Sequence, residues 1–154
     1  ALEVTSSVRS VIPDGMPLMV RISATEYMDN GWSMDDSVEL SGWLKEEGVD
    51  LIDCSSGGNA ADQNLDPFPG YQVPFSSRIR REVDIPTGAV GLITDASQAE
   101  QTLRNGDADV ILLARELLRN PYWPLKARDE LDDVDDLWPD QYVRARLSRR
   151  TRGR

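Results

Sequence analysis

Short apolar runs and amphipathic stretches alternate along the chain. The apolar runs cover residues 17–23, 49–54, 87–90 and 110–113, and each is followed by a stretch with helical spacing. Helix-bearing connections between short apolar strands are typical of parallel β/α structure. Four such units are half of an eight-stranded barrel, so we predict an α/β fold, half of a TIM (β/α)8 barrel. The first run has the continuous apolar pattern of a strand that is buried on both faces.

Capping signals define the expected helices. Ser33 or Asp35 can cap a helix that runs to about residue 47, with Gly48 after its end and Trp43 packed between helix and sheet. Asp95 opens a helix after the third strand, and another begins near residue 115. A helix is also expected at 75–82, and the apolar positions 2, 8, 11 and 12 indicate that the chain begins within a helix.

The stretch 87–121 contains the strongest indication of a binding site in the sequence. Its two apolar runs end at small residues, Gly91 and Ala114, and a predicted helix begins after each. Small residues let the backbone approach a ligand closely, while N–H groups and the helix dipole favour negative charge. In eight-stranded β/α barrels, phosphate groups commonly bind after the last two strands. We therefore predict an anion cradle at Gly91, Ala114 and Arg115.

Two segments lie outside this repeat. Residues 59–72 are too long for a simple connector, so we expect this loop to be functional or packed over the barrel mouth. From residue 132 the chain is acidic, then aromatic, then basic. We therefore divide it into a barrel domain, residues 1–131, and a C-terminal arm, residues 132–154.

The charge is unevenly distributed. The 154 residues carry a formal charge of −10, but residues 144–154 contain six arginines and no acid. Without those six, 11 basic residues face 27 acidic ones, so residues 1–143 carry −16. Such an acidic body binds nucleic acid poorly at long range, and we expect no nucleic-acid partner. For the basic end alone, the alternatives are a binding segment for an acidic partner or nucleic acid and a solvated tail.

The residue types exclude some chemistry. The chain has no histidine, which removes histidine catalysis and the commonest metal ligand, and we predict no metal site. The single cysteine, Cys54, lies in an apolar run and is expected to be a buried thiol. With no run of 18 apolar residues and no signal-peptide pattern, we expect a cytoplasmic protein without a membrane anchor.

Five stretches, in order and with their spacing kept, resemble the C-terminal half of the Old Yellow Enzyme family, the FMN-dependent ene-reductases. They resemble in particular its bacterial, "thermophilic-like" subclass. The stretches are VRISATEY (20–27), EEGVDLIDCSSGG (46–58), FPGYQVPFSSRIR (68–80), GAVGLITDASQAEQTLRNGDADVILLARELLRNP (88–121) and DQYVRAR (140–146). The resemblance implies strands 5–8 of the barrel, FMN as cofactor and NAD(P)H as reductant.

The resemblance implies a flavin-facing catalytic role for Arg21. In the family this arginine faces the N1/C2 edge of the isoalloxazine and stabilises the negative charge of the reduced flavin. The residues themselves also call for a partner, because a buried, unpaired guanidinium between Val20 and Ile22 would be unstable. An internal ion pair with Asp53 or Glu26 is the alternative.

Five residues correspond to cofactor-binding positions of the family. Gly91, Ala114 and Arg115 match its FMN-phosphate cradle, and Ser56 and Gly57 match residues that flank the ribityl phosphate. Ala114 departs from the family, in which glycine usually precedes the arginine. A methyl group is tolerable there if φ is negative, but it otherwise crowds the phosphate. Without the resemblance, Ser56, Gly57 and Gly91 would be ordinary strand-end turns.

The arm has an implied role as well. Arg144 lies where the subclass carries an arginine that reaches into the neighbouring subunit's active site, and Arg146 is an equally reachable candidate. The resemblance therefore implies a homo-oligomer that exchanges its C-terminal arms.

The resemblance implies that the family's substrate-holding histidine pair (or His/Asn pair) lies on the fourth strand, and that further flavin-contacting residues lie on the first and third strands. None of these is in this chain. We therefore expect a partner, the N-terminal half of the barrel, as a separate chain or a missing segment; a homodimer of two such halves is the third option. The expected function is that of the FMN-binding half of an NAD(P)H-dependent oxidoreductase that reduces activated C=C bonds such as those of enones. One alternative is a non-catalytic half-barrel that only binds phosphate or FMN. Another is a barrel that binds a sugar phosphate.

Overall fold

The computed structural model describes residues 1–131 and 138–145 of the chain. Its elements are α1 (Leu2–Arg9), β1 (Met19–Ser23), α2 (Met34–Glu46), β2 (Leu51–Ser55), α3 (Val73–Val83), β3 (Thr87–Ala89), α4 (Ala96–Arg104), β4 (Val110–Ile111), α5 (Arg115–Arg119), α6 (Trp123–Glu130) and the 3-10 helix η1 (Asp140–Ala145). Every predicted strand–helix unit is present. None of the helices within the described residues is long and apolar enough to cross a membrane.

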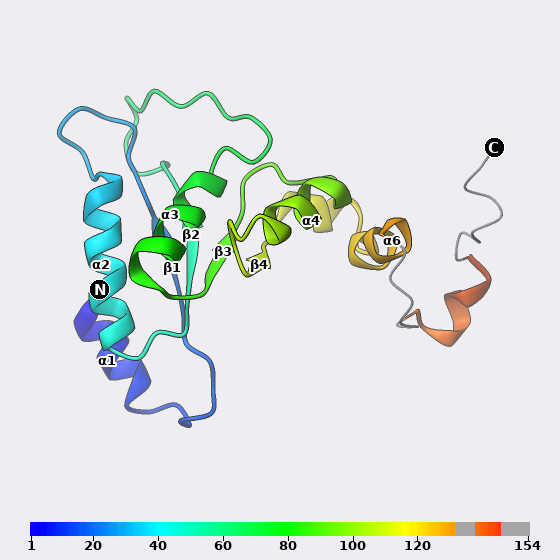
Figure 1. The fold of residues 1–154 in the computed structure, drawn as a ribbon, viewed down its shortest axis with the longest axis horizontal. Coiled ribbons are helices and arrows are strands. Elements are labelled where there is room, and N and C mark those ends of the chain that lie inside the picture. Colours follow the sequence, from blue (N-terminus) through cyan, green and yellow to red (C-terminus); the bar gives the residue numbers. More distant parts are fainter. Residues whose placement is uncertain (132–137, 146–154) are drawn as a thin grey trace.

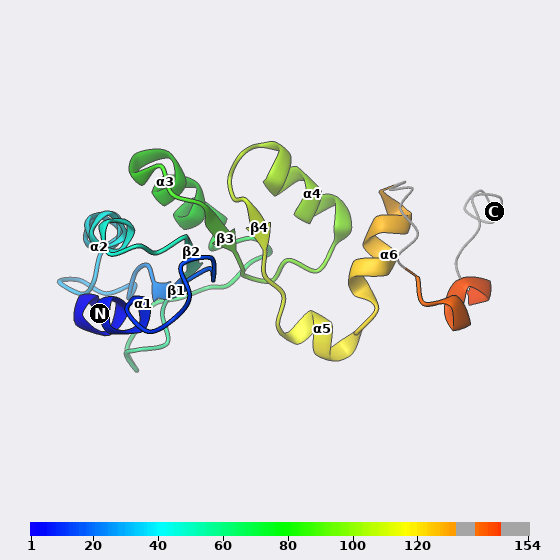
Figure 2. The same ribbon diagram turned by 90° about the horizontal axis from the view of Figure 1, so that it is seen from below.

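The four strands form one parallel sheet in the order β1-β2-β3-β4. Helices α2, α3 and α4 run along one side of it (Figure 1, Figure 2). The α/β prediction is therefore confirmed at the level of a parallel four-stranded sheet. The arrangement is consistent with a segment of a β/α barrel, in which a helix follows each strand and covers the outer face.

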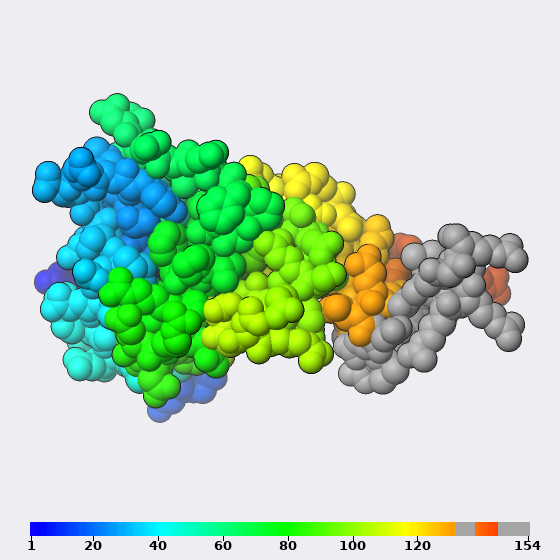
Figure 3. Space-filling view, turned by 45° about the horizontal axis from the view of Figure 1, so that its top comes forward, coloured from blue at the N-terminus to red at the C-terminus, as the bar shows by residue number. Residues whose placement is uncertain are grey.

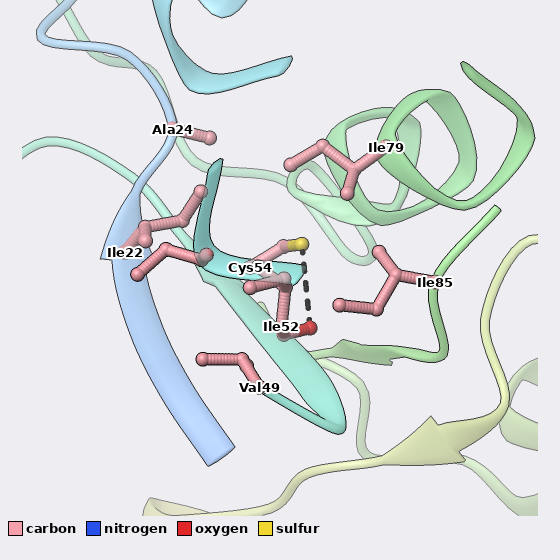
Figure 4. Close-up of a cluster of buried hydrophobic side chains, with 8 residues drawn as sticks. Ile22, Ala24, Val49, Ile52, Cys54, Ile79 and Ile85 are labelled. Carbon is pink, nitrogen blue, oxygen red and sulfur yellow. Dashed lines mark hydrogen bonds between the residues drawn. The ribbon is translucent and has the colours of Figure 1, made fainter. Parts of the chain in front are cut away.

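The main core lies between the sheet and the helices α2 and α3. Ile22 from β1 and Ile52 and Cys54 from β2 pack with Ile79 from α3 and Leu44 from α2 (Figure 4). Cys54 is fully buried, as predicted. Burial, and secondarily the neighbouring carboxylate on β2, raises the pKa of this thiol to about 12, so the thiol stays protonated at neutral pH.

A second, smaller cluster lies around β3 and α4. Its buried members are mostly alanines, and Trp123 from α6 packs against them. The Trp123 indole N–H also donates to the carbonyl oxygen of Thr94 at 2.7 Å, which ties α6 to the loop after β3. From there α6 extends the molecule away from the sheet (Figure 3). Tyr142 of η1 lies against Tyr122, with ring centroids 5.6 Å apart.

The beginning of α2 confirms the predicted cap. Ser33 accepts a hydrogen bond from the backbone N–H of Asp36, and the Asp36 carboxylate accepts one from the backbone N–H of Ser33. This reciprocal pair satisfies donors that the first turn of a helix leaves free.

Two predictions about burial are wrong. Trp43 is 45% exposed, because the buried face of α2 carries Ser37, Ser41 and Leu44 instead. Strand β1 is not buried on both faces, since Met19 is 60% exposed. In the described part of the chain only the face toward α2 and α3 is packed, so alternate side chains of β1 stay accessible.

Candidate functional site

A cavity of about 210 Å³ opens at the ends of β3 and β4. All three predicted cradle residues, Gly91, Ala114 and Arg115, line it together. Most of the remaining wall comes from residues 90–94 and 112–116, and Ser55 at the end of β2 completes one side. The structure therefore brings together two loops that lie more than twenty positions apart in the sequence, as the predicted cradle requires.

Backbone N–H groups form the main donor set of this cavity. Within residues 1–131 and 138–145, the N–H groups of residues 91–94 and 114–116 donate to no protein acceptor. Free N–H groups at the edge of a cavity are suited to the oxygen atoms of an anion. The first turn of α5 adds the positive end of its dipole, although five residues make this a small contribution.

The predicted contribution of the α4 N-terminus is wrong. The Asp95 carboxylate accepts hydrogen bonds from the N–H groups of Ser97 and Gln98 at 2.9 and 3.2 Å. These bonds use the free donors of the first turn and place a negative charge where the anion was expected. They also hold the pKa of Asp95 below its ordinary value, so the carboxylate stays charged. The anion donors therefore come from the loop before α4 and from α5.

Two arginines and one carboxylate sit in the cavity wall. Arg115 is exposed and has no ion-pair partner among the described residues. Glu116 also lines the cavity, but its carboxylate is bound by the Arg119 guanidinium at 2.7 Å. Because that pair neutralises Glu116, Arg115 remains as a net positive charge beside the free N–H groups.

Gly91 has a backbone conformation that other residues rarely adopt, with φ at +126°. A methyl group on it would come within 3.0 Å of the Gln72 side-chain nitrogen and 3.2 Å of the Tyr71 ring. Ala114, by contrast, has φ at −115°, which meets the condition for tolerating its methyl group. An added methyl group would therefore be crowded by Gln72 and Tyr71 at Gly91, whereas the methyl group of Ala114 is compatible with its backbone conformation.

A buried amide supports this cradle from behind. Gln72 is 3% exposed; its oxygen accepts from the Ser56 hydroxyl at 2.7 Å, and its nitrogen donates to the Val90 carbonyl at 3.0 Å. The Ser56 hydroxyl also lies 2.8 Å from the Tyr27 hydroxyl. Burial raises the pKa of Tyr27 against the lowering effect of that hydrogen bond. The Tyr27 phenol therefore stays protonated, and a polar chain runs from Tyr27 to the cradle.

These features fit the phosphate end of FMN. Free N–H groups, one unpaired guanidinium and a glycine whose Cβ would meet its neighbours are the donor chemistry and close backbone approach that a phosphate needs. When FMN is bound, Arg115 and the N–H groups of the two loops would hold its phosphate oxygens.

Arg21 lies outside this cavity, on β1. Its side chain is 58% exposed, so the guanidinium is not buried between its apolar neighbours in the sequence. The Arg21 Nε donates to the Asp53 carboxylate at 2.6 Å, which is the ion pair considered as the alternative. Parallel register places Asp53 directly beside Arg21, whereas Glu26 accepts from the backbone N–H of Trp32.

The other predicted residues that the structure describes do not line the cavity either. Ser56 and Gly57 are buried behind it, and Gly57 packs against Gln63 with φ at +64°. Arg144 is exposed on η1, and Arg146 lies outside the described residues. The ligand-contacting roles of Ser56, Gly57 and Arg144 stay predictions.

The sequence analysis missed two residues of the site. Gln72 lies at the end of the long loop that was expected to be functional or packed over the barrel mouth, but no local pattern marks this residue itself. Arg119 follows Arg115 by four positions, so the two lie on one side of a helix, and this spacing was a usable signal.

A family model described as the NADH:flavin oxidoreductase / NADH oxidase family matches residues 1–134. The chain belongs to this family. An NADPH dehydrogenase of Halalkalibacterium halodurans is 51% identical over 145 residues, which cover 94% of this chain and 42% of that relative. An NADPH dehydrogenase of Geobacillus thermodenitrificans is 56% identical over 142 residues, 92% of this chain and 41% of that relative.

These matches confirm the predicted relation to FMN-dependent flavin oxidoreductases. They also confirm the cofactor class, FMN with a reduced nicotinamide dinucleotide as reductant, for the family. The chain spans about two fifths of the length of the curated relatives that it matches.

Proposed function

We propose that this chain is the FMN-binding part of an NADPH-dependent flavin oxidoreductase of the ene-reductase type. The observation that carries the proposal is the cavity at the ends of β3 and β4. There, free N–H groups and the unpaired Arg115 converge in a chain of the flavin oxidoreductase family. When bound, FMN would supply hydride transfer from the nicotinamide to an activated C=C bond such as that of an enone.

The chain's own residues have separate tasks in this proposal. Arg115 and the loop N–H groups bind the phosphate, and Gly91 lets the backbone approach it. Arg21 supplies a cation for the pyrimidine edge of the flavin. Ser56 holds the end of β2 against the cradle through its hydrogen bond to Gln72.

We further propose that the chain works as the C-terminal half of a barrel completed by an N-terminal half. Three features support this. The sheet face opposite the helices is accessible at Met19 and Val110, no strand of the described residues pairs with the outer edges of β1 and β4, and the relatives are more than twice as long. A homo-oligomer in which Arg144 reaches the adjacent site belongs to the same proposal.

Retention of flavin by the completed barrel tests the proposal. Arg115→Glu replaces a phosphate-binding cation by an anion, so we expect FMN affinity to fall by a factor on the order of 100. Lys126→Glu on α6 makes the same charge change outside the cavity and serves as the control. Absorbance of the bound flavin after gel filtration gives the readout. Equal flavin retention in both variants would contradict the proposal.

A second candidate is a half-barrel that binds phosphate or FMN without turnover. The absence of histidine from the sequence favours it for the chain alone. NADPH oxidation with cyclohexenone separates the two candidates, measured with the chain alone and with its complementary half. Turnover that appears only with both halves supports the oxidoreductase, and FMN binding without turnover in the completed barrel supports the second candidate.

A further inference from the structure

The Arg21–Asp53 ion pair lies on the sheet face that turns away from the core. The neighbouring positions Ile22, Ile52 and Cys54 pack toward α2 and α3, so alternation places Arg21 and Asp53 on the opposite face. In register, Asp53 is flanked by Arg21 on β1 and by Gly88 on β3. Since Gly88 has no side chain, the carboxylate has a polar neighbour on one side only.

This face leads directly to the phosphate cavity. Ser55 lies two residues after Asp53 on β2, therefore on the same face and roughly 7 Å further along the strand, and it lines the cavity. Across the sheet, three strand spacings separate β1 from β4, about 14 Å. A ligand with its phosphate at the ends of β3 and β4 and a ring at β1 would pass over Asp53.

The ion pair with Asp53 holds the Arg21 guanidinium through one of its three nitrogens. Asp53 binds Nε through its Oδ2 atom, and within residues 1–131 and 138–145 neither terminal nitrogen of Arg21 has a hydrogen-bond partner. The terminal –NH2 groups are the donors that suit a planar pair of acceptors. A guanidinium held by Nε therefore keeps its bidentate donor edge for a ligand.

Stability does not explain this pair. Arg21 is 58% exposed, so solvent screening leaves little Coulomb gain from the pair. Asp53 is only 13% exposed, and its Oδ1 atom is buried without a hydrogen-bond partner among the described residues. Burying a carboxylate that is half satisfied opposes folding.

From this geometry, and resting on the proposed function, we propose that Asp53 is a positioning residue for Arg21. It directs the terminal –NH2 groups of Arg21 to the flavin's pyrimidine edge, and its negative charge lowers the reduction potential of bound FMN. The physical reason for the second effect is that a cation stabilises the negative charge of the reduced flavin, and a carboxylate 2.6 Å from that cation offsets part of its field.

The test is the reduction potential of FMN bound to the completed barrel, measured by dye equilibration. Asp53→Asn keeps a hydrogen-bond acceptor for Nε but removes the charge, so we expect a shift to a more positive potential. Glu100→Gln removes one negative charge from an exposed pair on α4 and should leave the potential unchanged. An unchanged potential in Asp53→Asn, or an equal shift in both variants, would overturn the proposal.

A second variant covers the case in which Asp53→Asn does not fold. Arg21→Lys keeps the positive charge and the pairing with Asp53 but has no second pair of donors. We expect a more negative potential and weaker FMN binding from it, and an unchanged potential would overturn the proposal. If the unmutated completed barrel retains no flavin, the proposed function itself fails. Flavin retention with an unshifted Asp53→Asn potential refutes only the role of Asp53.

Discussion

The Ser56 hydroxyl donates to the side-chain oxygen of Gln72 at 2.7 Å and ties the end of β2 to the residue before α3. The other end of the same amide donates to the Val90 carbonyl, just after β3. One buried side chain thus links three segments that meet at the strand ends. The shape of the phosphate cavity depends on Gln72 although no phosphate motif includes it.

Gln72→Ala should lower the free energy of unfolding by about 2–3 kcal/mol, because it leaves the buried Ser56 hydroxyl and the Val90 carbonyl without this partner. Gln101→Ala on the exposed face of α4 is the matched control, with an expected change within about 0.5 kcal/mol. Urea titration followed by tryptophan fluorescence measures both. Similar losses for the two variants would show that the buried amide has no special role.

Gly91→Ala should reduce both stability and FMN retention. The new methyl group meets Gln72 at 3.0 Å at a φ of +126°, and we expect destabilisation of about 1–3 kcal/mol. Gly42→Ala, in the interior of α2 with no atom within 4 Å of the added carbon, should instead stabilise by roughly 0.5–1 kcal/mol. Thermal unfolding of both variants checks the opposite signs, and a neutral Gly91→Ala would contradict the tight cradle.

Cys54 should make the protein less stable in alkali. Burial raises its pKa from 9.0 to about 12, so above pH 9 the unfolded state loses the thiol proton while the folded state keeps it. The free energy of unfolding then falls by up to about 1.4 kcal/mol per pH unit between pH 9 and 12. Cys54→Ala should remove this contribution. Urea titrations of both proteins at pH 8 and pH 10 measure it, and parallel pH profiles would count against it.

Asp109 should stabilise the fold at neutral pH and lose this effect in acid. Burial opposes its ionisation, but the Arg80 guanidinium and the Thr87 N–H outweigh burial and lower its pKa. The unfolded state is therefore protonated first as the pH falls, and the stabilisation disappears between the ordinary and the lowered pKa. Because Asp109 is a third exposed, we expect less than about 1 kcal/mol.

The measurement for Asp109 is the stability difference between the protein and Asp109→Asn at pH 7 and at pH 3. The difference should shrink at the lower pH. Asp62→Asn changes the same charge on an exposed loop and should alter stability little at either pH. A difference for Asp109→Asn that grows in acid would reverse the sign of this prediction.

The parts of the site that sequence analysis located are those set by local chemistry. Ser33, one of the two residues expected as the cap of α2, is the cap, and it was recognisable because a cap closes within one turn. Gly91 and Arg115 were found because each follows a strand, and the ends of parallel strands meet at one edge of the sheet. Neither Gly91 nor Arg115 by itself indicates a flavin; that assignment came from the ordered motifs.

The errors involve side chains whose environment comes from distant segments. Trp43 was placed in the core because it is large and apolar, but small serines at the proper spacing face the sheet. Asp95 was read as a helix start, which is correct, yet its carboxylate takes the donors that were assigned to an anion. Gln72 gave no signal, since its partners lie 16 and 18 positions away.

The parallel strand–helix order, the buried thiol of Cys54 and the two loops of the cradle could be read from the amino-acid order, because periodicity, composition and turn residues act over a few positions. The family was inferred from the resemblance of five ordered stretches along the chain. Only the tertiary structure decided that Arg21 pairs with Asp53 and not with Glu26, and that Gln72 supports the cradle. Strand register and the return of a long loop fix those contacts, and both arise from packing between segments that are far apart in the chain.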